Sequence, residues 1–322
     1  MNSGENAFEA TLAEYAEKIS GELESRLSDE SPAALYNAAK HPIRAGGMRL
    51  RPTLVLLVAE AFGVDADEQE AIIPAAAAVE LVHTLSIVHN DVIDEETMRR
   101  REPTTHTVWD TPTAILTGDV LFPKALETLF DTNVPTDALL SCQSELLNGC
   151  RQVFNGRSIA LSFDQEELPT ETEYIEMARL KTGSLFEASV RIGAIVAGAN
   201  EVEINRIGAY GRNLGIAHHI YDGVVDIVGE ADVLRKTSDT DILHGKETLV
   251  ALHARRRGLD LSGSDPTAEE MISTFESTGS IRYARDRALE YAQTAQRFLD
   301  PLPETPARRH LFELGDLVIN RV

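Results

Sequence analysis

The segment HTLSIVHNDVIDEETMRRREPTTH, residues 83–106, carries the most informative pattern in the chain. Asn90, Asp91 and Asp94 interrupt an apolar run, and three consecutive arginines follow at positions 99–101. If the run is helical, positions 90 and 94 lie one turn apart on the same face. Oxygen ligands at that spacing suit Mg²⁺, and guanidinium groups match phosphate oxygens. The segment therefore predicts a site for a metal ion and phosphate, and a solvated charged turn is the alternative.

A second acidic stretch, GIAHHIYDGVVDIVGE at residues 215–230, supports the metal site over the charged turn. Asp222 and Asp226 are again four residues apart in an apolar helical pattern. Two such helices, more than a hundred residues apart in sequence, can face each other across a bundle, and metal sites of bundles are built between facing helices.

Helical spacing of apolar residues dominates the rest of the chain. Its 322 residues are 43% apolar, enough for a large core, and no linker or repeat divides them. We expect an all-α fold, a single helical domain over residues 1–322. The longest apolar run, residues 72–88, contains Glu80 and His83, which predicts a buried helix and no membrane span.

The charge balance is strongly acidic. The chain has 52 acidic and 30 basic residues, a formal charge of −22, and only six of the basic residues are lysines. Such a surface predicts a salt-rich cytoplasm, where screening tolerates self-repulsion, and it argues against a nucleic-acid partner. Cys142 and Cys150 match no disulfide or zinc pattern, and the N-terminus is too polar for a signal peptide, so we expect a cytoplasmic protein.

Further basic residues lie where helices begin or where charge is costly to bury. Gly46 and Gly47 predict a tight turn before Arg51, and basic groups at a helix N-terminus make an anion site. Lys181 sits in an apolar run, where a diphosphate would stabilise its charge. Three of the six lysines, Lys181, Lys236 and Lys246, lie in or near the proposed site.

Local signals predict several element boundaries. We expect helices over residues 8–26, 111–131 and 135–155, followed by an irregular segment up to residue 172. Thr170 or Thr172 could cap the next helix, with Glu173 in its first turn.

Several motifs in order resemble the trans-type isoprenyl (polyprenyl) diphosphate synthases, over residues 42–249. GGMRLRP is similar to that family's GGKRxRP, HTLSIVHNDVIDEETMRRREPT to HxxSLxHDDxxDxxxxRRGxPT, KTGSLF to KTxxLF, and HHIYDGVVD to FQxxDDxxD. The resemblance implies an all-helical, usually dimeric bundle around a deep central cavity. It also implies a condensation of isopentenyl diphosphate with an allylic prenyl diphosphate, assisted by Mg²⁺.

The resemblance assigns a role to each matching residue. The metal ligands would be Asn90, Asp91, Asp94, Asp222 and Asp226. The allylic diphosphate would be bound by Arg99, Lys181, Lys236 and Lys246. His218 and His219 replace residues of the family motif, and by their own chemistry they could donate to this phosphate when protonated, or bind a softer metal. Isopentenyl diphosphate would be bound by Arg51, His83 and Arg100. Lys181 and Thr182 would also line the site of the carbocation.

The sequence departs from the family pattern at positions close to this chemistry, namely Met48, Asn90, Arg101, Arg157, Ala160, His218, His219 and Gly223. Met48 removes a cation and Gly223 removes a carboxylate, whereas Arg101 adds positive charge. Three hypotheses remain open. The chain is an active, weakened synthase; an impaired homologue that binds or regulates an active partner in a heterodimer; or an enzyme that acts on a prenyl diphosphate without elongating it. Leu85 and Ser86, upstream of the first motif, are not aromatic, so we expect a geranylgeranyl product.

Overall fold

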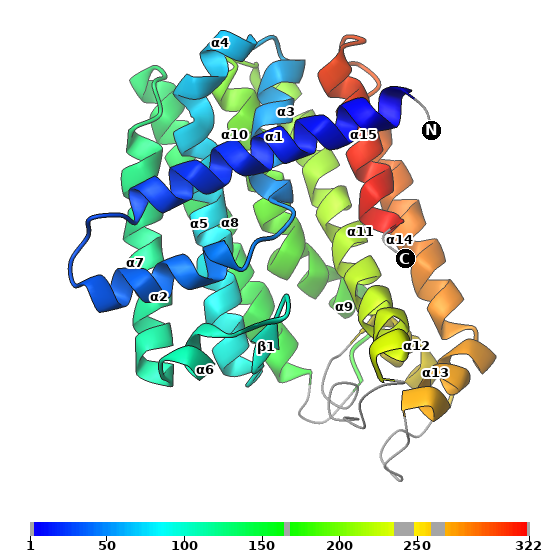
Figure 1. The fold of residues 1–322 in the computed structure, drawn as a ribbon. Helices are drawn as coiled ribbons and strands as arrows, with labels where there is room; N and C mark the ends of the chain where they lie inside the picture. The colour runs from blue at the N-terminus through cyan, green and yellow to red at the C-terminus, as the bar shows by residue number, and fades with distance from the viewer. Residues whose placement is uncertain (1–2, 164–167, 235–247, 259–267, 321–322) are drawn as a thin grey trace. The chain divides into compact units, whose positions relative to one another are not determined.

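The computed structural model describes residues 3–163, 168–234, 248–258 and 268–320, and most of them are helical (Figure 1). The elements in chain order are α1 (Ser3–Arg26), α2 (Ala33–Arg44), α3 (Leu50–Ala61), α4 (Ala66–Gln69), η1 (Glu70–Ile72), α5 (Ile73–Ile93), β1 (Met98–Arg99), β2 (Glu102–Pro103), α6 (Thr105–Val108), α7 (Thr111–Phe130), α8 (Thr136–Ser162), α9 (Glu171–Ala178), η2 (Arg179–Gly183), α10 (Ser184–Val196), α11 (Glu201–Leu234), α12 (Leu249–Arg256), α13 (Ala268–Ser277), α14 (Ser280–Arg297) and α15 (Pro306–Ile319). The predicted all-α fold is confirmed.

The chain forms two compact units. Unit 1 comprises residues 1–150, 188–207 and 302–311, and unit 2 comprises residues 151–187, 208–301 and 312–322. Four of the boundaries fall inside α8, α10, α11 and α15, so the chain passes from one unit to the other within continuous helices. The expected single domain over residues 1–322 stays a prediction.

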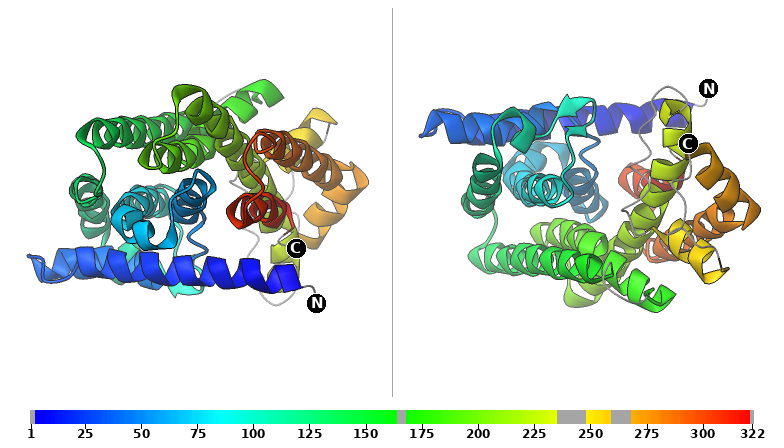
Figure 2. Two further views of the ribbon diagram at one scale, coloured as in Figure 1. Left: turned by 90° about the horizontal axis from the view of Figure 1, so that it is seen from above. Right: turned by 90° about the horizontal axis from the view of Figure 1, so that it is seen from below.

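Helix α5 is the centre of unit 1. It packs against α7 and α3, and α1 lies across α3 and α5 (Figures 1 and 2). Residues 54–58 of α3 and 75–79 of α5 are fully buried, because alanines on α5 let the helices approach closely. The segment Glu70–Ile93 is long and apolar enough to cross a membrane, but 83% of its most apolar window is buried in the protein. This burial is typical of a core helix, as predicted.

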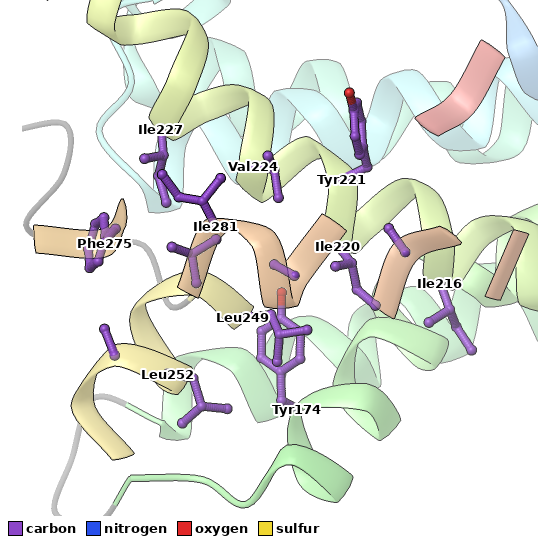
Figure 3. Close-up of a cluster of buried hydrophobic side chains, with 14 of the residues drawn as sticks. Tyr174, Ile216, Ile220, Tyr221, Val224, Ile227, Leu249, Leu252, Phe275 and Ile281 are labelled. Atoms are coloured by element: carbon purple, nitrogen blue, oxygen red, sulfur yellow. The ribbon is translucent and has the colours of Figure 1, made fainter. Parts of the chain in front are cut away.

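Unit 2 has its own apolar core, formed by α9, α11, α12, α13 and α14 (Figure 3). Tyr174 of α9 contributes one of the largest fully buried side chains, and Ile220 and Val224 of α11 lie one turn apart in the same cluster. Leu249 of α12 and Ile281 of α14 complete the contact. The apolar stripe of α11 thus faces this core, and its polar residues lie on other faces.

Two boundary predictions meet different outcomes. Thr170 caps α9, because its hydroxyl accepts the Glu173 N–H at 3.2 Å and the Glu173 carboxylate accepts the Thr170 N–H at 2.6 Å. The irregular segment predicted from residue 155 is wrong at its start, because α8 continues to Ser162. Polar residues there continue the helix with an exposed face, which a polarity argument mistakes for a loop.

The two cysteines lie buried in α8 as free thiols, as expected. Burial raises the pKa of Cys142 to about 12 and that of Cys150 to about 11. Both side chains are therefore protonated and unreactive near neutral pH.

Candidate active site

The first acidic motif lies at the C-terminal end of α5, in unit 1. Asp94 is the residue that ends the helix, and its N–H donates to the Asn90 carbonyl at 2.8 Å. Asn90 is half-buried and Asp94 is exposed. The side-chain oxygens of these two residues, one turn apart, are therefore accessible at the end of a rigid core helix.

Asp91 differs from its neighbours because it already has a cation partner. Its side chain is only 6% exposed, and its Oδ1 accepts the Arg99 Nε–H at 2.7 Å and lies 2.6 Å from Arg99 Nη2. Burial raises the pKa of Asp91, although Arg99 opposes that effect. The ion pair holds the Arg99 side chain against Asp91, near the C-terminal end of α5. The predicted role of Asp91 as a metal ligand stays a prediction.

The loop at Gly46 and Gly47 leads into α3 through a buried ion pair. Arg49 adopts a left-handed backbone conformation, with a φ of 50°, just before the helix. Its Nη1 donates to Glu80 Oε1 at 2.8 Å and its Nη2 to the Ile43 carbonyl at 2.7 Å. Both charged side chains are only 3% exposed. Arg49 therefore connects the start of α3 to α5 and α2.

The residues predicted to bind isopentenyl diphosphate gather around this loop. Arg51 Nη1 lies 3.1 Å from His83 Nε2, between α3 and α5. Arg100 donates to the Gly46 carbonyl, and its guanidinium lies against Gly47. Met48 is 47% exposed on the same loop and brings no charge. Unit 1 therefore holds two such contacts, Arg51 with His83 and Arg100 with the Gly46–Gly47 loop, and guanidinium groups suit an anionic ligand.

A pocket lies beside these groups in unit 1. It is a small depression lined by residues of α2, α5, the hairpin and α6 and by the residue that follows α2: His41, Pro42, Ala45, Ile87, Asp91, Arg99, Arg100, Pro103, Thr104 and Thr105. The Asp91–Arg99 ion pair therefore borders a shallow concave surface.

In unit 2, Lys181 and Thr182 lie in η2, a short π-helical turn between α9 and α10. Such turns widen the helix by one residue and often occur at functional sites. Helix α8 approaches η2 at Gly156, where an added Cβ would lie 2.6 Å from the Lys181 Cα. The sequence predicted a site role for Lys181 and Thr182 but gave no signal for the π turn or for this contact.

The second acidic motif lies on α11. Thr182 Oγ1 is 2.9 Å from His219 Nδ1, and His218 Nδ1 is 3.0 Å from Asp222 Oδ2. Burial lowers the pKa of His219 to about 3, and the nearby charge of Lys181 adds to this effect. His219 is therefore neutral near physiological pH, and one of its ring nitrogens interacts with the Thr182 hydroxyl. A neutral His219 can donate to phosphate only through its other ring nitrogen.

The structure leaves little space for a side chain at Gly223, where the family motif has a carboxylate. An added Cβ would lie 3.1 Å from Thr248 Cγ2 and 3.2 Å from Thr248 Cβ. Thr248 caps α12 and is buried.

The two carboxylates of the second motif differ in exposure, because Asp226 is exposed and Asp222 is half-buried. Lys236 and Lys246 lie outside the residues that the structure describes.

A magnesium ion suits the donor set within each unit. Among residues 3–163, 168–234, 248–258 and 268–320, no three His, Cys, Asp or Glu side chains are grouped to hold a metal. Mg²⁺ usually binds one or two carboxylates and completes its shell with water and substrate phosphates, so a protein cage is not required. The oxygen donors of Asn90, Asp94, Asp222 and Asp226 fit this pattern, and the neutral His219 is engaged by Thr182.

Comparisons with known proteins agree with these motifs. A family model described as polyprenyl synthetase matches residues 32–284. The chain is 37% identical over 316 residues to a geranylgeranyl pyrophosphate synthase of Geoglobus acetivorans, covering 96% of this chain and 98% of the relative. It is 32% identical over 332 residues to a geranylfarnesyl diphosphate synthase of Natronomonas pharaonis, covering 97% of each. The structure is similar to that of a geranylgeranyl pyrophosphate synthetase from Pyrococcus horikoshii, with a TM-score of 0.89, 33% identity and 100% of both chains covered.

Proposed function

The chain belongs to the polyprenyl synthetase family of prenyltransferases, and from this premise we propose that it condenses isopentenyl diphosphate with an allylic prenyl diphosphate. The observations that carry the proposal are the contact of Arg51 with His83 between α3 and α5 and the hydrogen bond from Arg100 to the Gly46 carbonyl. Guanidinium groups match diphosphate oxygens, and side chains that are already held by the protein lose less freedom when a ligand binds.

Arg51, His83 and Arg100 hold isopentenyl diphosphate in this proposal. The allylic diphosphate binds Arg99, Lys181, Lys236 and Lys246, and His219 contributes its free ring nitrogen. Within this second set, the guanidinium of Arg99 is fixed by Asp91 through two contacts with one oxygen. Holding the two substrates in a fixed geometry supplies much of the rate acceleration of a bimolecular reaction.

We propose Mg²⁺ as the cofactor, with Asn90, Asp91, Asp94, Asp222 and Asp226 as the candidate ligands. When bound, the ion neutralises the diphosphate that leaves the allylic carbon. Asn90 and Asp94 are the accessible donors of the first motif, and Asp91 acts mainly by positioning Arg99. Thr182, hydrogen-bonded to the neutral His219, presents an uncharged hydroxyl dipole to the developing carbocation beside Lys181.

A geranylgeranyl product follows from the residues upstream of the first motif. Leu85 is buried in α5, and the Ser86 hydroxyl donates to the His83 carbonyl at 2.7 Å. Neither residue is aromatic, so neither stops the chain early. We expect Leu85→Phe to shorten the product, measured by chromatography of the dephosphorylated alcohols. An unchanged product distribution would refute this assignment.

We also propose a homodimer. Helix α8 carries exposed large apolar side chains spaced seven residues apart, which places them on nearly one face: Leu140, Leu147, Phe154 and Leu161. Light scattering after size exclusion should give twice the mass of the 35.3 kDa chain. Leu147→Asp should then give the monomer mass. A monomeric parent would contradict the homodimer, and a heterodimer isolated with an active homologue would favour the regulatory alternative.

The acidic composition favours a salt-rich cytoplasm. With 52 acidic and 30 basic residues, the folded chain repels itself at low ionic strength. We expect the thermal midpoint to rise between low and molar potassium chloride. Equal midpoints at both salt concentrations would contradict this proposal.

The decisive experiment is an assay of the purified protein with Mg²⁺, isopentenyl diphosphate and each short allylic diphosphate, at low and high salt. The same assay is applied to the combined variant Met48→Lys, Asn90→Asp and Gly223→Asp. Elongation by the parent supports the synthase, which the family membership already favours. Elongation only by the combined variant supports the impaired partner. Release of pyrophosphate without elongation supports altered chemistry.

A further inference from the structure

The hairpin between α5 and α6 has an unusual turn. Strand β1 pairs with β2 so that Arg99 lies opposite Glu102, which leaves Arg100 and Arg101 as a two-residue connection. Both have positive φ, 54° and 67° respectively. Two-residue hairpin turns with positive φ at both positions strongly prefer Asn-Gly or Gly-Gly, because side chains disfavour the left-handed region. Two arginines here are locally unfavourable.

Local strain of this kind persists where the surrounding structure and function favour it. Two of the three consecutive arginines have evident protein partners. Arg99 binds the Asp91 carboxylate, and Arg100 donates to the Gly46 carbonyl. Within the part of the chain that the structure describes, Arg101 has neither a hydrogen bond nor an ion pair, and its side chain is exposed. Its charge is therefore available to a ligand.

The position of the turn identifies the ligand. Arg100, the other residue of the turn, lies against Gly47. This glycine belongs to the loop that precedes Arg51, and Arg51 in turn contacts His83 of α5. We infer that Arg101 is a further binding residue for the diphosphate of isopentenyl diphosphate. This inference rests on the proposed function and extends its set of cations. The strained turn keeps both guanidinium groups at the tip of the hairpin. Removing the charge at position 101 should therefore weaken the binding of isopentenyl diphosphate.

The test separates the charge of Arg101 from its backbone conformation. Arg101→Asn removes the charge and tolerates positive φ, and Arg101→Gly removes both the charge and the strain. We expect both variants to raise the KM for isopentenyl diphosphate by about tenfold to a hundredfold, the usual effect of losing a charge-assisted hydrogen bond. The KM for the allylic substrate should change little. Arg101→Lys, which retains a cation, should recover part of the loss.

Asp29 provides the matched control, because it is exposed, has a φ of 58° and lies in the segment after α1. Asp29→Gly and Arg101→Gly should both raise the thermal midpoint, by roughly 2 °C for a chain of this size. Only Arg101→Gly should raise the KM. A purely structural role for Arg101 predicts parallel changes in both variants.

Calorimetric titration of isopentenyl diphosphate into the parent and Arg101→Asn keeps this inference distinct from the proposed function. If the parent binds but does not elongate, the proposed reaction fails while the titration still tests Arg101. Weaker binding by Arg101→Asn supports the inference. Equal binding by the two proteins, or a change confined to the allylic substrate, would overturn it.

Discussion

The two acidic motifs differ in what holds their side chains. At the end of α5, charged groups have partners of opposite charge: Asp91 binds Arg99, and three turns earlier Glu80 binds Arg49. On α11, two contacts of the described residues involve histidines: Asp222 Oδ2 lies 3.0 Å from His218 Nδ1, and Thr182 Oγ1 lies 2.9 Å from His219 Nδ1. The first motif thus shows how an ion pair with Arg99 holds the Asp91 carboxylate at the end of a core helix. The second motif adds a buried imidazole, His219, whose lowered pKa keeps it neutral near physiological pH.

The largest expected effect comes from the buried ion pair. Arg49→Ala leaves the Glu80 carboxylate buried without its guanidinium, so the free energy of unfolding should fall by about 3–5 kcal/mol. Urea denaturation followed by circular dichroism measures the loss. The double variant Arg49→Met, Glu80→Leu should recover most of the stability, because no charge remains buried. A loss below about 1 kcal/mol for Arg49→Ala would mean that this buried ion pair contributes no more than a surface pair.

A second variant tests the packing of the other motif. Gly156→Ala places a methyl group against the backbone of Lys181, which cannot yield as a flexible side chain would. We expect a loss of about 1–3 kcal/mol in stability and a lower kcat, because η2 shifts and moves Thr182. Gly21 in α1 has open space around its Cα, so Gly21→Ala is the matched control and should stabilise by about 0.5–1 kcal/mol. Equal behaviour of the two variants would contradict the role of the close contact.

The contact at Gly223 predicts a smaller and reversible effect. Gly223→Asp alone should lower the free energy of unfolding by about 1 kcal/mol, because the new Cβ crowds Thr248. Adding Thr248→Ser removes the crowding methyl and keeps a capping hydroxyl at α12. The pair should regain the lost stability and bind Mg²⁺ with pyrophosphate more tightly than the parent, as measured by calorimetry. An additive loss in the pair would exclude crowding as the cause.

The smallest effect at neutral pH is expected at His219. Its folded-state pKa of about 3 lies below its usual value of 6.5. Between these two pH values the unfolded chain binds a proton that the folded chain does not, so stability falls as the pH falls through this window. His219→Gln should therefore lose less stability than the parent between about pH 7 and about pH 5. Urea midpoints at both pH values measure this difference. Parallel curves would show that His219 contributes nothing to the pH dependence of stability.

Much of the fold was predictable because its signals are local. Apolar residues at helical spacing gave α5 and α11, and the sequence around Thr170 and Glu173 gave the start of α9. Asn90 and Asp94 follow from the same periodicity, since residues four apart share a helix face. Arg51 and His83 were assigned to one substrate by resemblance, and the structure shows that Arg51 Nη1 lies 3.1 Å from His83 Nε2.

The remaining features depend on contacts distant in sequence. Arg49 and Glu80 are 31 residues apart, and only the oddity of a glutamate in an apolar run could have suggested the ion pair. The spacing of apolar residues does not indicate the contact between Gly156 and Lys181, and it does not indicate the π turn. The turn at Arg100 and Arg101 was not predicted because its sequence contradicts the usual preference for glycine or asparagine.

The buried cysteines of α8 have a practical consequence for labelling this enzyme at chosen sites. Because both native thiols stay protonated inside the helix packing, they should react very slowly with maleimides near neutral pH. A single cysteine placed on the tip of the hairpin or on α11 would then be the fast-reacting thiol. Fluorescent or spin labels could thus report on each acidic motif separately, without removing either native cysteine.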